Sequence, residues 1–192
     1  MPDSKTRSLS YHLLSRMFYY PEKDEGILIA GSGQLNCLNH LSHCEELQPR
    51  IDHLLETLGQ VDLEALQMEY VRLFDYRPVC PPYETAYLQG RQKNQTVKNL
   101  KKLYRQAGLQ CREEEAHDHV IAELEFMHYL YAQEDKDKEN PLWKIIGSAF
   151  LEDHLLKWLP PFCKALQKNA VEPYQQLGHI VSVVIASEHK RQ

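Results

Sequence analysis

Apolar residues recur every three or four positions along most of the chain, and this spacing constrains the fold more than any other feature of the sequence. Side chains at that spacing share one face of an α-helix, so each stretch can bury one apolar stripe. The spacing predicts helices over residues 8–20, 51–58, 62–74, 96–107, 118–131, 141–159, 162–167 and 174–185. The run IVSVVIA within the last segment has the composition of a strand, but no second strand-like segment exists to pair with it. The sequence therefore predicts an all-α fold.

Prolines, glycines and capping residues divide this pattern into elements. Three prolines in residues 75–90 predict an irregular, extended segment, and Pro160-Pro161 is expected to break or kink the helix that reaches it. Asp62 and Asp118 are predicted N-caps, and Gly108 is expected to end a helix. Residues 21–49 predict only short helices joined by loops. Short connections favour a compact multi-helix bundle that occupies residues 1–192 as a single domain.

Charge and cysteine usage limit the classes of partner and compartment. The chain has 22 basic and 27 acidic residues, a net charge of −5, and so lacks the field that holds a nucleic acid. No apolar run approaches the roughly 18 residues needed to span a bilayer, and the opening MPDSKTRSLS has no secretory signal. Five cysteines without a CxxC pair fit reduced thiols better than a disulfide framework. We expect a cytoplasmic protein without stable membrane insertion, and a cationic partner more readily than a polyanion.

The sequence has few marks of catalysis or metal binding. It contains no glycine-rich phosphate loop, no GxSxG and no HExxH, so the usual local marks of nucleotide-dependent and common hydrolytic chemistry are missing and we expect no nucleotide cofactor, although a dispersed catalytic triad leaves no such mark. Cys37, His40 and Cys44 would share a helix face with zinc-type ligands, and residues 117–119 (His117, Asp118, His119) form a second cluster. Leucines interleave with the first cluster, and helix capping by Asp118 explains the second without an ion. A small helical metalloprotein or enzyme built on either cluster is the alternative prediction.

Tyrosines gather around the proline-rich segment. Tyr70, Tyr76, Tyr83 and Tyr87 lie in it or in the helix that leads into it. Amphipathic rings beside prolines build rigid surfaces that accept peptides. The same rings could instead pack the loop onto the bundle, and residue types alone leave both interpretations open.

Four short segments taken together resemble one protein family. They are EYVRLF (69–74), PPYET (81–85), DHVIAELEFM (118–127) and FLEDHLLKWLP (150–160). Their order and separation are similar to those of the TorD/DmsD/NarJ family of redox enzyme maturation proteins. These are chaperones that mature molybdenum-cofactor enzymes. The resemblance extends over about half of the chain.

The resemblance implies an all-helical, non-catalytic chaperone of the TorD type. Such a protein binds the N-terminal leader, often a twin-arginine signal peptide, and the apo form of a molybdopterin-dependent oxidoreductase subunit. It assists cofactor insertion and delays export until folding is complete, as a monomer or a domain-swapped dimer. The peptide-binding positions carried over from the family are Tyr70, Leu73, Phe74, Pro82, Tyr83, Glu84, Asp118 and His119. The chain departs from the family at His117, where proline is common, and at Thr85, where serine is common.

A leader that combines arginines with an apolar helix needs an apolar groove edged by carboxylates. We expect Tyr70, Leu73 and Phe74 to supply that groove. Glu84, Asp118 and the run 113–115 are expected to face the arginines. A charge-assisted hydrogen bond contributes about 1.5–3 kcal/mol, whereas ordering a leader costs roughly 2–5 kcal/mol, so apolar contacts must supply most of the affinity.

Overall fold

Every regular element of the described chain is a helix. The computed structural model describes residues 3–23, 27, 35, 37–38, 45–112 and 116–189, and in these ranges Tyr83 and His119 form an isolated bridge but no strand occurs. The all-α prediction is confirmed. The elements are α1 (Ser4–Arg16), α3 (Leu47–Leu58), α4 (Leu63–Phe74), the 3-10 turn η2 (Glu84–Tyr87), α5 (Gln92–Gln106), α6 (Val120–Lys136), α7 (Pro141–Phe150), the π-helical turn η3 (Leu151–Leu155), α8 (Leu156–Asn169) and α9 (Tyr174–His189).

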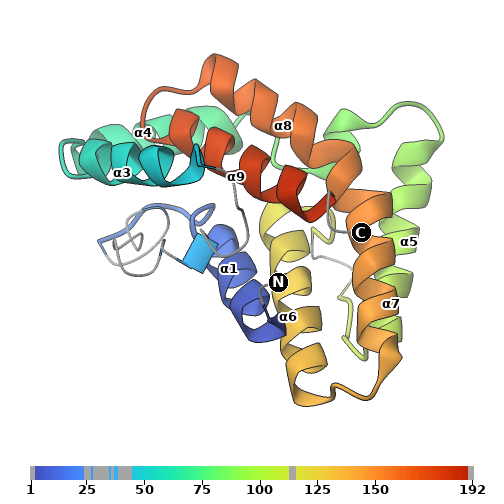
Figure 1. Cartoon of the computed structure of the whole chain (residues 1–192). Coiled ribbons are helices and arrows are strands. Elements are labelled where there is room, and N and C mark those ends of the chain that lie inside the picture. The colour runs from blue at the N-terminus through green and yellow to red at the C-terminus, as the bar shows by residue number, and fades with distance from the viewer. Residues whose placement is uncertain are drawn as a thin grey trace.

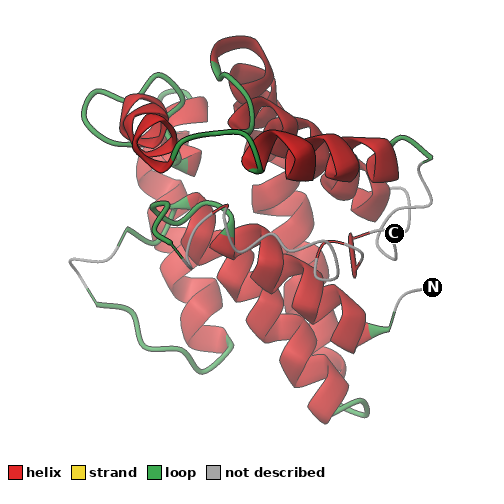
Figure 2. Cartoon of the chain, turned by 90° about the vertical axis from the view of Figure 1, so that its left-hand side faces the viewer, coloured by secondary structure: helices red, strands yellow, loops and turns green. Residues whose placement is uncertain are grey.

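The helices pack as a bundle with two strongly packed pairs. Helix α1 lies along α6, and α8 lies along α9, while α7 packs on α6 and α3 on α9 (Figure 1). Helices α3 and α4 lie at one end of the view and α5 at the other. Figure 2 shows helices joined by loops throughout the described part of the chain. The predicted compact bundle is confirmed.

Large aromatic side chains fill the core where these helices meet. Trp158, Tyr11, Tyr174, Phe18 and Phe162 are fully buried. Helix α9 approaches α8 closely at Gly178, where a Cβ atom would lie 2.9 Å from the Cβ of Leu166. A larger residue at that position would push the two helices apart, because core packing leaves no spare volume.

Several predicted helix ends are confirmed by their caps. The carboxylate of Asp62 accepts hydrogen bonds from the N–H groups of Glu64 and Ala65, and Gly108 follows α5 with a φ of 81°. Helix α1 begins earlier than predicted because Asp3 accepts from the N–H of Thr6 at 2.7 Å. The IVSVVIA run lies in α9. Most of the segment 21–44, where short helices were predicted, lies outside the described residues.

The predicted break at Pro160-Pro161 is wrong. Both prolines lie inside α8, and both are exposed, so neither ring meets the core. The regular α-helical pattern is interrupted earlier, at η3, whose wider turn directly precedes the helix. The two carbonyls that lose a proline N–H partner would be those of the first residues after that turn. The α-helical pattern is therefore interrupted at η3, before the two prolines.

Candidate functional site

Three of the family-like motifs meet at one place in the fold. The N–H of Val120 donates to the carbonyl of Pro82 at 2.8 Å, and the N–H of Glu84 donates to the carbonyl of Asp118 at 2.9 Å. Between them, Tyr83 and His119 form the antiparallel bridge. The proline-rich segment is thus fastened to the beginning of α6 by its backbone.

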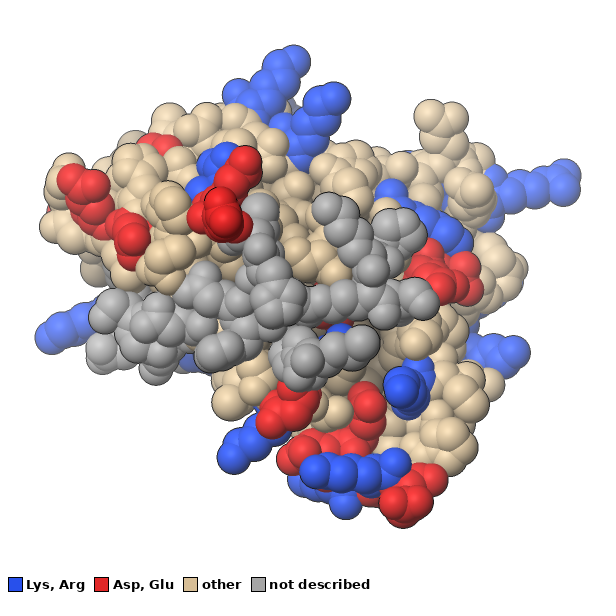
Figure 3. Space-filling view, in the orientation of Figure 1, with Lys and Arg blue, Asp and Glu red and all other residues tan. Residues whose placement is uncertain are grey.

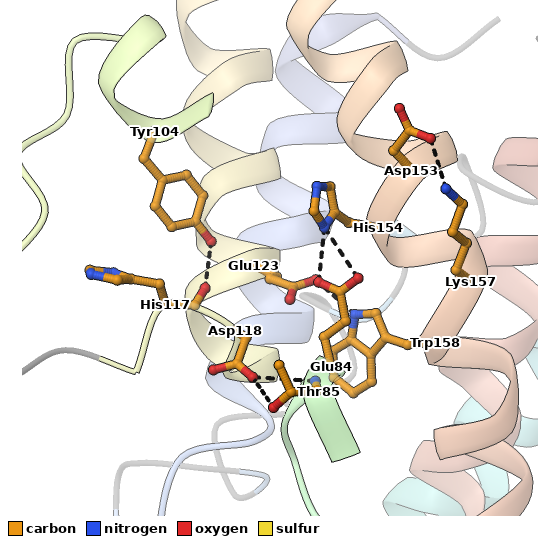
Figure 4. Close-up of polar contacts among 10 residues, drawn as sticks. All are labelled: Glu84, Thr85, Tyr104, His117, Asp118, Glu123, Asp153, His154, Lys157 and Trp158. Atoms are coloured by element: carbon orange, nitrogen blue, oxygen red, sulfur yellow. Dashed lines mark hydrogen bonds and ion pairs between the residues drawn. The ribbon is translucent and has the colours of Figure 1, made fainter. Parts of the chain in front are cut away.

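Side chains extend this contact into a buried polar network, which we call the motif junction: Glu84, Thr85, Asp118, Glu123, His154 and Trp158 (Figure 4). Nδ1 of His154 lies 2.9 Å from Oε2 of Glu84. The hydroxyl of Thr85 donates to Asp118 at 2.6 Å, and the indole N–H of Trp158 donates to Glu123 at 2.8 Å. The network joins PPYET, DHVIAELEFM and FLEDHLLKWLP, and the last of these contributes through η3 and α8. This shared geometry explains why the three motifs occur together.

The motif junction is buried and carries several acids. Glu84, Glu123 and His154 are each less than 5% exposed, and Asp118 is 8% exposed. Burial, and then the nearby Glu84 carboxylate, hold the pKa of Glu123 well above its usual range. A glutamic acid kept protonated in this way can remain beside a second carboxyl group without strong repulsion. The arrangement stabilises the fold.

The apolar residues of the α4 motif are also interior. Leu73 is fully buried and Phe74 is 6% exposed, and the Phe74 ring packs edge-on against Phe18 and Tyr174. Tyr70 is half-buried, and its hydroxyl donates to the carbonyl of Phe18 at 3.1 Å. The expectation that these side chains line an open groove is not met in this structure. They attach α4 to the bundle.

Glu84 and Asp118 likewise point inward rather than toward an approaching peptide, because each already has a partner within the motif junction. The run 113–115, also expected to face arginines, lies outside the described residues. A peptide-binding role for the eight carried-over positions stays a prediction.

His119, rather than Asp118, caps α6. Nδ1 of His119 accepts a hydrogen bond from the N–H of Ile121 at 3.2 Å, so the predicted cap at Asp118 is wrong. Because burial disfavours the charged ring, the pKa of His119 falls to about 4, although Asp118 opposes this shift. The neutral imidazole packs edge-on against the half-buried ring of Tyr83, with 5.0 Å between the centroids. These are the two carried-over side chains that remain partly accessible together.

His119 also borders an open concavity of about 620 Å³, which we call the aromatic concavity. Its lining comprises Tyr19, Tyr104, Leu109, Gln110, Ala116, His117, His119, Ile121, Ala122, Glu125, Phe126 and Tyr129. The hydroxyl of Tyr19 donates to Glu125 at 2.5 Å, and burial together with this carboxylate raises the pKa of Tyr19 to about 12. The surface combines apolar side chains with one carboxylate at its edge. Sequence reasoning missed it because its residues come from three separate segments.

The two candidate metal clusters have little support in the described residues. Nε2 of His117 bonds to the carbonyl of Arg112 at 2.8 Å, while Asp118 and His119 hold Thr85 and α6. Cys37 is half-buried, but His40 and Cys44 lie outside the described residues. Within the described ranges, no group of three or more histidine, cysteine or acidic side chains is placed to hold an ion.

Four of the five cysteines lie among the described residues. Cys80 and Cys163 are buried, Cys37 and Cys111 are half-buried, and all four are free thiols. Among the described helices, none is long and apolar enough to cross a membrane.

The sequence is similar to one protein family and to several named proteins. A family profile described as nitrate reductase delta subunit matches residues 42–164. The perchlorate reductase assembly chaperone of Dechloromonas aromatica is 32% identical over 122 residues, which is 60% of this chain and 53% of that protein. The chaperone protein TorD of Vibrio cholerae is 23% identical over 84% of this chain and 80% of its own length. The chlorate reductase assembly chaperone of Ideonella dechloratans is 24% identical over 97% of this chain and 90% of its own length.

The fold is also similar to a solved structure. A candidate redox enzyme maturation protein from Archaeoglobus fulgidus superposes with a TM-score of 0.57 at 23% identity, over 96% of this chain and 94% of that one. At this identity the likeness shows a shared all-helical fold. The match to the perchlorate reductase chaperone spans about half of that relative's length.

Proposed function

The chain belongs to the nitrate reductase delta subunit family, as its motifs predicted, and from this premise we propose that it is an assembly chaperone for a molybdopterin-dependent oxidoreductase. The family profile covers residues 42–164, two relatives are named as reductase assembly chaperones, and a third is named as the chaperone protein TorD. The proposal rests on this agreement between the family match and the names of the relatives. In this role the protein works in the cytoplasm, has no catalytic activity and needs no cofactor of its own.

The finer proposal is that the protein binds the N-terminal leader of the client's catalytic subunit, often a twin-arginine signal peptide, together with the apo form of that subunit. Binding delays export until the molybdenum cofactor has been inserted. The aromatic concavity supports this proposal because an apolar leader helix can pack on half-buried Leu109, Ile121 and Tyr129. A leader arginine can approach the carboxylate of Glu125, which lines the concavity.

The carried-over positions then divide into two groups. Tyr83 and His119 are partly accessible beside the concavity, and we propose that they touch the leader. The others act by holding the wall of the concavity in place through the bundle core and the motif junction: Tyr70, Leu73, Phe74, Pro82, Glu84 and Asp118. Leu73→Asp would consequently disturb folding, and it is not a clean test of leader binding.

A matched pair of substitutions tests whether the leader binds at the aromatic concavity. Ile121→Asp places a charge on the concavity, and the new acid lies in the first turn of α6, where a helix tolerates it. Ile145→Asp makes the same change on α7 at a side chain that is 63% exposed and outside the concavity. A fluorescein-labelled twin-arginine leader from a molybdopterin oxidoreductase of the same genome is titrated against each variant, with fluorescence anisotropy as the readout.

We expect Ile121→Asp to weaken binding about tenfold or more, because a carboxylate in an apolar contact must be desolvated. Ile145→Asp should bind as the parent chain does. Failure of the parent chain to bind any such leader would reject leader binding. Equal losses in both variants would reject the aromatic concavity as the binding surface. For the rival metalloprotein interpretation, stoichiometric zinc or iron in protein purified in metal-free buffer would be the supporting result.

A further inference from the structure

Helix α5 is strongly basic, although the whole protein is acidic. Residues 91–112 contain seven lysines and arginines and no aspartate or glutamate, whereas the whole chain has a net charge of −5. The helix packs on the bundle through its other face, where apolar side chains such as Leu100 and Tyr104 are buried. The leader-binding proposal does not use the basic face of this helix.

Four of these residues form one line, which we call the basic stripe: Arg91, Lys98, Lys102 and Arg105. Their separations of seven, four and three residues place them on one face of the helix, over about 20 Å. All four are exposed, and no ion pair joins any of them to a carboxylate in the described part of the chain. Figure 3 shows the blue side chains along the right-hand edge of the molecule, where α5 lies.

A polar groove of about 470 Å³ runs beside the basic stripe. Lys102 belongs to both, and Gln92, Gln95, Asn99 and Gln106 of α5 line the groove. The far wall carries the ion pair of Asp153 and Lys157, at 2.8 Å, on η3 and α8. Side-chain amides both donate and accept hydrogen bonds, as do the main-chain groups of an extended peptide.

We propose that the basic stripe and its groove bind an extended acidic segment of a partner protein. The lysines and arginines pair with carboxylates of that segment, and the α5 amides pair with its main chain. A membrane surface is a poorer fit, because none of the large exposed apolar side chains of the described residues lies on α5, so nothing there would insert among lipids. Nucleic acid is disfavoured by the net negative charge, which repels a long polyanion beyond a short contact.

The test uses the full chain and a synthetic peptide of alternating glutamate and serine, labelled with fluorescein. The double variant Lys98→Glu/Lys102→Glu reverses two charges on the basic stripe. The control Lys164→Glu/Lys168→Glu makes the same net change at two exposed lysines with the same four-residue spacing on α8. Circular dichroism melting establishes that both variants keep the fold.

We expect the parent chain to bind the peptide at low salt, and the Lys98→Glu/Lys102→Glu variant to bind it about tenfold more weakly, while the control loses much less. Binding should weaken as salt rises. A second variant, Gln95→Leu, should weaken binding at high salt as well, because it removes a main-chain contact rather than a charge. Equal losses in the two double variants, no binding of the peptide by the parent chain, or stronger binding of single-stranded DNA or anionic lipid vesicles than of the peptide would each overturn the proposal.

Discussion

The motif junction and the basic stripe are opposite in almost every physical respect. In the motif junction, Glu84 and His154 are buried and joined to each other, and both belong to motifs recognisable in the sequence. In the basic stripe, Lys98 and Arg105 are exposed and belong to no motif. The groove beside α5 touches both regions, since Glu84 and His154 line it together with Lys102. Two adjoining parts of one molecule thus differ in burial, in partners and in sequence signature.

The difference shows what a recognisable sequence motif indicates in a protein of this family. A buried polar group must be satisfied by a specific partner, so few residue types are acceptable there. An exposed basic side chain has many acceptable replacements, and its position follows from whichever partner it meets. The motifs therefore mark the scaffold, and we expect partner specificity to lie on surfaces with weaker patterns.

The largest effect should come from removing the indole at the motif junction. Trp158 is fully buried, packs against Tyr87 and Phe162, and donates to Glu123. Trp158→Ala should lower the free energy of unfolding by about 3–5 kcal/mol, because it creates a cavity and strands a buried acceptor. Urea unfolding followed by far-UV circular dichroism measures it, with half-buried Trp143→Ala as the control. Similar losses in both variants would show that the motif junction is no more critical than the periphery.

A second prediction compares the pairs made by two neighbouring residues of η3, the buried pair of His154 with Glu84 and the exposed pair of Asp153 with Lys157. His154→Leu leaves the buried Glu84 carboxylate without its partner and should cost about 3 kcal/mol, whereas adding Glu84→Leu should recover part of that loss. Lys157→Ala breaks the exposed pair with Asp153 and should change stability by less than about 1 kcal/mol. Chemical unfolding of the parent chain, Glu84→Leu, His154→Leu and the double variant gives the coupling energy. Additive losses at Glu84 and His154 would show that their contact contributes no coupling to stability.

The third prediction concerns acid sensitivity. The folded chain lowers the pKa of His119 from 6.5 to about 4 through burial, so this residue contributes stability above pH 6.5 that is lost as the pH falls toward 4. At pH 5 that loss should be about 1–2 kcal/mol. The pKa of Glu123 is raised, so its contribution has the opposite sign and is lost as the pH rises above its ordinary value.

Two substitutions separate the contributions of His119 and Glu123 to the pH dependence of stability. His119→Asn keeps a capping side chain and should lose less stability between pH 8 and pH 5 than the parent chain does. Glu123→Gln should lose more, because it removes the group that favours the folded state in acid. Urea midpoints at several pH values measure both. If the stability of all three proteins changed with pH in the same way, titration of His119 and Glu123 would not contribute to the acid sensitivity.

The sequence predicted the helices well because apolar periodicity reports directly which side of a segment is buried. It could not tell whether an apolar face meets the bundle or a peptide, and so Leu73 and Phe74 were placed in an open groove instead of the core. Asp118 was expected to cap α6 because aspartate is a common cap, yet Thr85 engages it and His119 takes the position. Such choices depend on tertiary partners that lie far away in the sequence.

The candidate surfaces were harder still to predict. The aromatic concavity joins Tyr19, Leu109 and Glu125, which have no fixed spacing and come together only in the folded bundle. The charges of α5 were visible in the sequence, but a charge run is usually a solvated face. The exposure of the basic stripe, the lack of ion pairs of its four residues in the described part of the chain and the adjoining groove distinguish it only once the fold is known.

The smallest effect on stability should come from the basic stripe. Lys98→Ala removes an exposed charge for which the described residues provide no ion pair, so the free energy of unfolding should change by less than about 0.5 kcal/mol. Binding of the acidic peptide should nevertheless weaken about threefold at low salt, and the difference should vanish at high salt, because the lost contact is a screened charge pair. Urea unfolding measures the stability, and fluorescence anisotropy measures the peptide binding, on the same preparation of the variant. A loss of stability comparable to that of His154→Leu would mean that α5 belongs to the scaffold, and the contrast between the two regions would be false.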